Sequence, residues 1–314
     1  PTLERLAAGG LRYNNFHTTA LCSPTRNALK TGRNHHTTNT GSIMETATGF
    51  PGNTGQIPNR VAPLAEMMRL NGYSTGAFGK WHETAAWETS VSGPFDRWPT
   101  HSGFDKFYGT IIGAGSFYDP ATLCRGNTFI TPENDQEYQP KTYYYTDAIS
   151  DNAVTFLKEH AEESPDKPVF LYLPYTTAHW PMHALPEDIA KYKGKYDGGY
   201  DPIRATRFKR VKEMGLVKDS VKLSKRPDDW EKASNKEWEI RNMEVYAAMI
   251  DNMDQGIGRV VAEFKRQGTL ENTLIFYLQD NGACAEGFGR YKSKRPYRTD
   301  YKPLGKDGFQ AKIW

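Results

Sequence analysis

Two short and almost purely apolar runs, residues 169–173 (VFLYL) and 273–278 (TLIFYL), most strongly constrain the fold of this chain. Runs of this length suit strands that are buried on both faces, as in a parallel sheet covered by helices on each side. Between them, apolar residues recur every three or four positions from Met243 to Phe264, which predicts a long amphipathic helix that ends near Gly268. The chain is therefore expected to fold around a central sheet.

Helical and strand-like patterns also alternate near the N-terminus. A helical pattern over 2–9 precedes a strand-like stretch over 11–16, and a helix over 61–70, ended by Gly72, precedes a strand over 73–78. This alternation predicts one α/β domain, doubly wound, with a largely parallel central sheet and helices on both faces. The segment 94–139, rich in glycine, proline and aromatic residues, has no clear period and is expected to form excursions over the sheet.

Polar clusters follow three of the expected strands: residues 79–82 (GKWH), 176–183 and 280–282 (DNG). Ligands of doubly wound sheets bind beyond the carboxyl ends of the strands. These clusters are therefore expected to converge on one site at one edge of the sheet.

The segment Cys22-Ser23-Pro24-Thr25-Arg26 lies between a strand-like stretch and a helix-compatible run over 27–30. Pro24 fits the first turn of a helix, so the Cys22 side chain is expected at a helix N-terminus. Backbone N–H groups and the helix dipole favour an anion there, and Arg26 adds a permanent positive charge. The sequence thus predicts an anion site at Cys22.

The pattern Cys22-x-Pro24-x-Arg26, followed by Thr31-Gly32-Arg33, resembles the signature of type I sulfatases, the formylglycine-dependent arylsulfatase family of the alkaline phosphatase-like superfamily. The resemblance continues in the family's order through the 2–9 helix, GKWH at 79–82, HWPMH at 179–183 and QDNG at 279–282. It implies the alkaline phosphatase-like fold and a sulfuric ester hydrolase that cleaves aryl or carbohydrate sulfate monoesters.

Site residues follow from the same resemblance. It implies that a formylglycine-generating maturation enzyme converts Cys22 into the nucleophile and that Arg26 steadies it. Lys80, His82 and His179 are implied to contact the sulfate or the leaving group. Residue 22, Asp280 and Asn281 are implied to bind Ca²⁺, with Mg²⁺ as the alternative. The family also places two aspartates before the 2–9 helix and a lysine after the Asp280–Asn281 pair, which find no match here. Residues 1–314 are therefore expected to form a partial catalytic domain without the first core strand and the C-terminal subdomain.

The chemistry that the resemblance implies explains these residue types. The aldehyde hydrate offers one hydroxyl to attack sulfur and a second to expel sulfate, and cations neutralise the charge that develops on the sulfate oxygens. Departure of the alcohol requires a proton, which is assigned to His179, with Lys80 as the competitor.

Two other functions remain open from the residues: a phosphodiesterase or phosphonate monoester hydrolase of the same superfamily, and a catalytically inactive sulfatase-like binding domain. A zinc site built from His17, His35, His36 and Cys22 is disfavoured because their spacing lacks paired ligands. Cys124 and Cys284 are interpreted as structural, and His183 and Arg33 as lining the pocket or supporting it.

The net charge of +3 is mild, and the basic runs 204–226 and 290–306 are given no nucleic-acid partner, because acidic residues interrupt the first and the second suits a loop. No apolar run is long enough for a membrane span. The compartment stays open between the cytoplasm, the periplasm and secretion.

Overall fold

The computed structural model describes residues 1–226 and 230–283. Its strands are β1 (Ser74–Lys80), β2 (Lys106–Thr110), β3 (Leu123–Arg125), β4 (Thr128–Phe129) and β5 (Val169–Tyr172). Its α-helices are α1 (Thr2–Ala8), α2 (Cys22–Thr31), α3 (Leu64–Leu70), α4 (Tyr145–Glu163), α5 (Pro186–Ala190), α6 (Tyr200–Glu213) and α7 (Lys236–Arg266).

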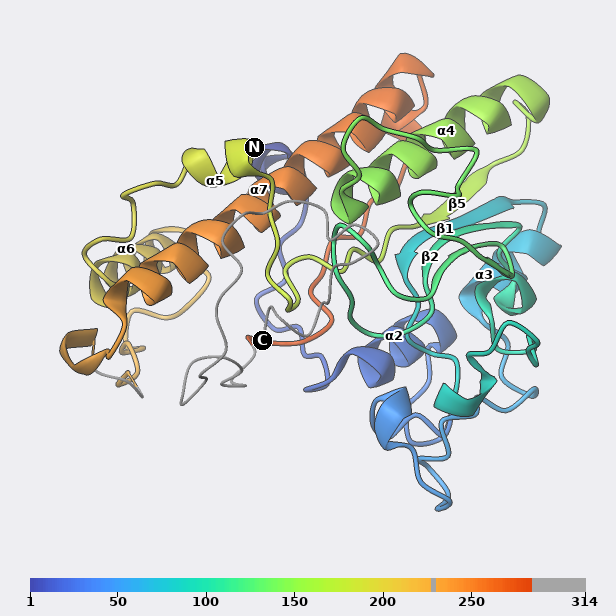
Figure 1. Cartoon of the computed structure of the whole chain (residues 1–314), viewed down its shortest axis with the longest axis horizontal. Coiled ribbons are helices and arrows are strands. Elements are labelled where there is room, and N and C mark those ends of the chain that lie inside the picture. The colour runs from blue at the N-terminus through green and yellow to red at the C-terminus, as the bar shows by residue number, and fades with distance from the viewer. Residues whose placement is uncertain (227–229, 284–314) are drawn as a thin grey trace.

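The strands form one sheet in the order β4-β3-β2-β1-β5 (Figure 1). β1 pairs in parallel with both β2 and β5, whereas β3 and β4 add an antiparallel edge. The parallel part confirms the α/β prediction. Because β1 lies between two parallel neighbours, its carboxyl end at Lys80 opens at the edge where ligands bind in folds of this class.

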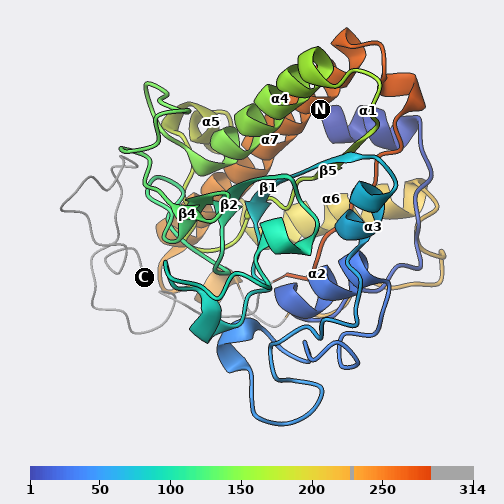
Figure 2. The same cartoon turned by 90° about the vertical axis from the view of Figure 1, so that its right-hand side faces the viewer.

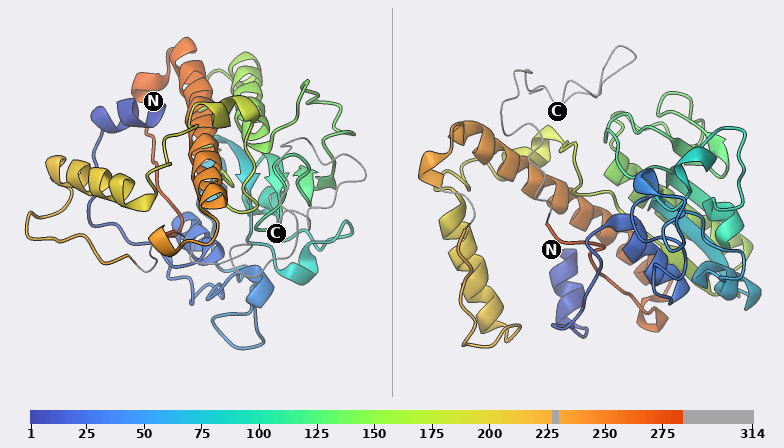
Figure 3. Two further views of the ribbon diagram at one scale, coloured as in Figure 1. Left: turned by 60° about the vertical axis from the view of Figure 1, so that its left-hand side comes forward. Right: turned by 90° about the horizontal axis from the view of Figure 1, so that it is seen from below.

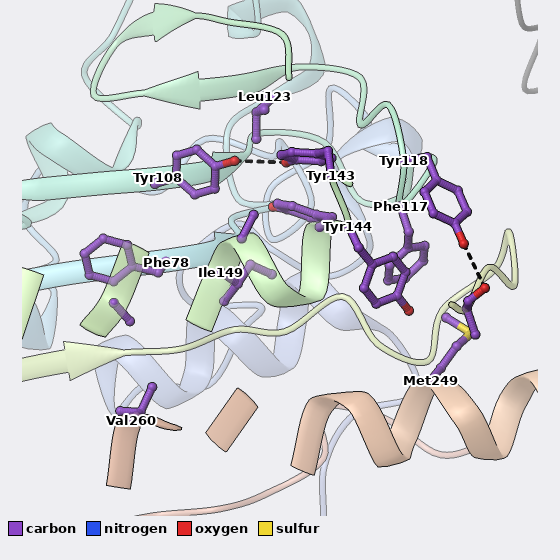
Figure 4. Packing of buried hydrophobic residues seen from close by; sticks show 14 of the residues in the cluster. Phe78, Tyr108, Phe117, Tyr118, Leu123, Tyr143, Tyr144, Ile149, Met249 and Val260 are labelled. Carbon is purple, nitrogen blue, oxygen red and sulfur yellow. Dashed lines mark hydrogen bonds between the residues drawn. The ribbon is translucent and has the colours of Figure 1, made fainter. Parts of the chain in front are cut away.

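Alternate residues of β1 serve two apolar layers. Phe78 packs with Tyr108 of β2 in a cluster that includes the inner faces of α4 and α7, and Ala77 packs with Phe107 in a second cluster against α3. Figure 2 shows the α4–α7 pair on one side of the sheet and α2 and α3 on the other. In the first layer the Tyr108 and Tyr143 hydroxyls are hydrogen-bonded at 2.9 Å, so these buried polar groups satisfy each other (Figure 4). Helices therefore cover both faces, as predicted.

Two close contacts fix the helices of the larger layer. Gly256 of α7 faces Ser150 of α4, where an added Cβ would lie 2.1 Å from the Ser150 hydroxyl, so only glycine permits this approach. Asp254 of α7 accepts hydrogen bonds from the backbone N–H groups of Thr2 and Leu3 at 2.6 and 2.7 Å, and so satisfies the first donors of α1. The predicted helices over 2–9 and 243–264 are thus confirmed, the second as part of the longer α7.

Two strand predictions are wrong. Residues 11–16 and 273–278 form no strand in the described part of the chain, and Leu11 and Leu274 are 88% and 80% exposed. Apolar composition favours a strand, but a strand exists only when a neighbour supplies backbone hydrogen-bond partners. For the same reason β5, expected at the centre, is the half-buried edge of the described sheet.

The segment 94–139 is more regular than predicted. It contains β2, β3 and β4, so the expectation of excursions alone was wrong. These strands are short and interrupted by turns, which hides their period of two.

Helix α6 carries part of the basic run 204–226 and lies beyond the N-terminal half of α7, away from the sheet (Figure 3). Some of its charges are paired at the surface, with Arg210 against Glu4 and Lys209 against Glu213. The second basic run, 290–306, and Cys284 lie outside the described residues. Among the helices that are described, none combines the length and the apolar character that a membrane crossing requires.

Candidate active site

Cys22 is the first residue of α2, as the Pro24 argument predicted. Leu21 before it is extended, and Thr25 of the first turn accepts a hydrogen bond from the backbone N–H of Thr19 at 3.0 Å, which fixes the chain at the point where the helix begins. The Cys22 side chain is only 8% exposed. The thiol therefore occupies a buried helix N-terminus, where backbone N–H groups favour negative charge.

Lys80, the last residue of β1, reaches this thiol. Its ammonium donates to the Cys22 sulfur at 3.1 Å, and the side chain is almost fully buried. Gly79 makes the approach possible, because its φ of 133° disfavours other residues and a Cβ there would meet the Pro174 carbonyl oxygen at 2.3 Å. The backbone of β1 thus delivers the lysine to the start of α2.

His179 and His82 complete the surroundings of the thiol. Burial raises the pKa of Cys22, but favourable polar interactions with His179 and His82 and the positive charge of Lys80 outweigh it and lower the pKa to about 5. His179 follows β5, and its Nδ1 donates to the Trp180 carbonyl at 2.7 Å. The site is therefore arranged to hold negative charge at residue 22.

Arg26, one turn after Cys22, connects the site to Asp280, which follows the apolar stretch 273–278. Its Nε donates to the Asp280 carboxylate at 2.7 Å, and its guanidinium also donates to the Lys80 carbonyl at 2.8 Å. Burial raises the pKa of Asp280, but the charges of Arg26 and Lys80 outweigh it and hold the pKa below its ordinary value. Asp280 is thus an ionised carboxylate beside the thiol's helix.

Two of the three predicted metal ligands, Asp280 and Asn281, offer oxygen donors. The Asn281 side-chain oxygen is buried and makes no hydrogen bond within the described residues, and Asp280 is ionised. An orphaned amide oxygen beside a carboxylate suits a hard cation such as Ca²⁺ or Mg²⁺. No group of three or more histidine, cysteine, aspartate or glutamate side chains with metal-binding geometry occurs in ranges 1–226 and 230–283.

Three side chains on one face of α2 attach this helix to residues 80–83. Besides Arg26, the Ser23 hydroxyl donates to the His82 carbonyl at 2.6 Å, and Lys30 forms a buried ion pair with Glu83. Lys30 also lies 3.3 Å from the centre of the Trp81 ring. The spacing 23, 26, 30 places these residues on one helical face. The sequence contains this spacing, but the charge of Lys30 suggests a solvent-exposed face instead of a buried one.

Sequence reasoning missed Glu45, which reaches His82 from a loop. Its carboxylate lies 2.8 Å from the His82 Nε2. Burial raises the pKa of Glu45, and the hydrogen bond and charge of His82 lower it further than burial raises it. No periodicity marks residue 45, so only its acidic character offered a signal.

Other candidates lie outside this cluster. His183 is buried among aromatic residues and stacks on Tyr118, so it supports the core, and Arg33 is exposed. Cys124 is buried in the second apolar layer, and burial raises the pKa of its thiol, which agrees with a structural role. A cavity of about 440 Å³ is lined by Lys30, Trp81 and Glu83 among others, and it includes none of the predicted site residues.

Comparison with known proteins decides the family. The family model described as Sulfatase matches residues 1–306. The chain belongs to the sulfatase family. Among curated relatives, an uncharacterized sulfatase of Schizosaccharomyces pombe is 34% identical over 309 residues, which cover 90% of this chain and 53% of the relative. The arylsulfatase of Klebsiella aerogenes is 29% identical over 323 residues, which cover 98% of this chain and 67% of the relative.

Solved structures show the same fold for this sulfatase. The crystal structure of yidJ from Bacteroides fragilis aligns with a TM-score of 0.59 at 17% identity, covering 87% of this chain and 54% of that one. BT4656, solved in complex with its substrate D-glucosamine-2-N,6-O-disulfate, aligns with a TM-score of 0.54 at 19% identity, covering 87% of this chain and 58% of that one. The sulfatase neighbours have the alkaline phosphatase-like fold, and the chain spans about half to two thirds of the relatives named above.

Proposed function

We propose that this chain carries the catalytic centre of a sulfuric ester hydrolase whose nucleophile is derived from Cys22. The observation that supports the proposal most directly is the contact of one buried side chain, at a helix N-terminus, with Lys80, His82 and His179. Lys80 and His82 come from the end of β1 and the residues after it, and His179 comes from the segment after β5. Their common feature is that each can stabilise negative charge at residue 22.

A sulfate ester is an anion, so the site must first bind and neutralise it. The Lys80 ammonium, the start of α2 and the Arg26 guanidinium provide positive charge in a buried setting, where electrostatic interactions are stronger than in water. When residue 22 is converted to formylglycine by a maturation enzyme, its hydrated aldehyde supplies one hydroxyl that attacks sulfur and another whose deprotonation releases the sulfate.

The leaving alcohol needs a proton, and His179 is proposed as its donor. The Trp180 carbonyl can only accept, so His179 Nδ1 carries hydrogen, and Nε2 must carry a second proton that passes to the oxygen of the leaving alcohol. General acid catalysis of this kind typically contributes about 10²–10⁴-fold. Lys80, at 3.1 Å from the sulfur, is the competing donor.

Asp280 and Asn281 are proposed to hold Ca²⁺, or Mg²⁺, together with the residue 22 side chain. They would supply two of the roughly six to eight oxygen ligands that Ca²⁺ takes. The cation would polarise the sulfate oxygens. Because Arg26 also contacts Asp280, it would hold this ligand in orientation.

The substrate is proposed to be an aryl or carbohydrate sulfate monoester. BT4656 was solved with a disulfated glucosamine and a further structural neighbour with a neocarrahexaose, so related folds accommodate sugars. The positive charges around residue 22 suit the sulfate group that all members of this class share.

The proposal is tested by expressing the chain with a formylglycine-generating enzyme and identifying the residue 22 peptide by mass spectrometry. We expect conversion of Cys22 and turnover of p-nitrophenyl sulfate that exceeds turnover of p-nitrophenyl phosphate and of bis-p-nitrophenyl phosphate. The Cys22→Ala variant is the matched inactive control.

Each alternative has its own result. Preferred turnover of a phosphate ester would replace the sulfatase proposal with a phosphodiesterase or phosphonate hydrolase. Full conversion of Cys22 without turnover of any ester would indicate the inactive binding domain.

A further inference from the structure

Glu45 lies on a single helical turn, Met44–Thr46, within a loop that the structure holds firmly. The neighbouring Met44 is buried, and backbone hydrogen bonds from Gly41 to Gly52 and from Thr48 to Asn53, at 2.9 and 2.7 Å, close the loop around the turn. The loop therefore presents the Glu45 carboxylate from a fixed base.

Both carboxylate oxygens of Glu45 lie close to the His82 ring. The Nε2 atom is 2.8 Å from one oxygen and 3.1 Å from the other. An ionised carboxylate can only accept a hydrogen bond, so this contact requires the proton of His82 to be on Nε2. The pair joins a half-exposed side chain, Glu45, to a buried one, His82.

Three further contacts leave His82 little freedom. Its backbone has a φ of 58°, in the left-handed region. The His82 N–H donates to the Ile111 carbonyl at 3.0 Å, and the His82 carbonyl accepts from the Ser23 hydroxyl. Gly113 packs on the ring, where an added Cβ would lie 2.3 Å from Cε1. The remaining ring nitrogen, Nδ1, is buried and has no hydrogen-bond partner among the described residues.

We propose that Glu45 is a positioning residue for the reaction at residue 22: it accepts the Nε2–H of His82, fixes the ring beside Cys22, and leaves Nδ1 as the nitrogen that serves the reacting centre. The kinetic part of this inference rests on the proposed function. The structural part, the ring orientation and the tautomer of His82, does not depend on it.

An ordinary salt bridge at the rim of a pocket predicts something different. Such a pair contributes little to stability and leaves the chemistry of its partner unchanged. A positioning role instead predicts that loss of Glu45 alters the ring of His82 and the rate of turnover while binding of substrate stays nearly constant. Glu45 is half-exposed, so its replacement should not unfold the protein.

The first measurement uses the full chain with Cys22 unconverted, so it requires no activity. The tautomer of His82 is read from the ¹⁵N shifts of its ring nitrogens at roughly pH 8.5, about two units above the ordinary histidine pKa, with the signals assigned by their loss in His82→Gln. We expect the Nε2–H tautomer in the unmodified chain and in Glu45→Gln, whose amide oxygen still accepts. Glu45→Ala should show a mixture of tautomers.

The second measurement uses the converted protein and p-nitrophenyl sulfate. Loss of a group that orients a functional histidine typically lowers activity about 10–100-fold, so we expect Glu45→Ala to lower kcat by about this factor with KM changed less than about threefold. Glu45→Gln should lower kcat less than Glu45→Ala does, because its amide oxygen still accepts the Nε2–H. Glu66→Ala, which removes a partly exposed glutamate paired with Arg69 on α3, is the matched control and should match the unmodified chain.

An unchanged His82 tautomer in Glu45→Ala overturns the inference, as does a loss that appears in KM alone or equally in Glu66→Ala. If the converted chain hydrolyses no ester, the proposed function fails, and the tautomer measurement alone decides whether Glu45 positions His82.

Discussion

Replacement of Lys30 by methionine tests the attachment of α2 to the end of β1. Lys30 is 6% exposed and its partner Glu83 is 0% exposed, so the variant leaves a carboxylate buried without a counter-charge. Breaking a buried ion pair from one side typically costs about 3–5 kcal/mol. Because both side chains line a cavity of about 440 Å³, the orphaned carboxylate has room to rotate toward it, so we expect the lower end of this range.

The free energy of unfolding is measured by urea denaturation followed through tryptophan fluorescence. We expect Lys30→Met to lower it by about 3 kcal/mol, and the double variant Lys30→Met/Glu83→Leu to recover most of that loss, because no charge then remains buried. The matched control is Arg69→Met, which breaks the exposed pair with Glu66 and should change stability by less than about 1 kcal/mol. A Lys30→Met variant as stable as Arg69→Met, or a double variant as unstable as the single one, would refute the reasoning.

Three further predictions concern the site. In the unconverted chain, alkylation of Cys22 by iodoacetamide should be slow below pH 5 and reach a plateau above it, because the pKa is lowered to about 5 and the reactive thiolate forms above that pH. A pH profile of the alkylation rate with its midpoint near the ordinary thiol pKa of about 8.5 contradicts this. Lys80→Met should move the midpoint upward, because the positive charge is lost, and should lower kcat of the converted enzyme by about 10²–10³-fold; an unmoved midpoint would show that Lys80 does not act on residue 22. Added Ca²⁺ should raise the Tm of the full chain, more so at higher Ca²⁺ concentration, and Asp280→Asn should abolish the increase. An equal increase in both proteins would place the cation elsewhere.

Much of the site could be predicted because parallel strands end at the same edge of a sheet. Lys80 is the last residue of β1, His82 lies two residues beyond it, and His179 follows β5, so the positions of two strand ends were sufficient to bring them near Cys22. The helix start at Cys22 was equally readable, since Pro24 is tolerated in a first turn.

Other features depend on contacts that no local pattern encodes. Glu45 belongs to an aperiodic loop, and its role appears only once the loop folds over His82. Lys30 is charged and so suggests a solvent-exposed position, yet Glu83 and the Trp81 ring compensate its burial. The apolar stretch 273–278 shows the converse, because a strand requires a hydrogen-bonded neighbour that hydrophobicity cannot supply.

The attachment of α2 to residues 80–83 through Ser23, Arg26 and Lys30 has a consequence for how such an enzyme could diversify. Residue 22, the proposed nucleophile, and the Lys80 ammonium are held together by these contacts, whereas Glu45 and His179 reach them from separate loops. Insertions or exchanges in those loops could therefore reshape the space for the alcohol half of a substrate without displacing the group that attacks. Chemistry and selectivity would then be free to evolve at different speeds within one chain.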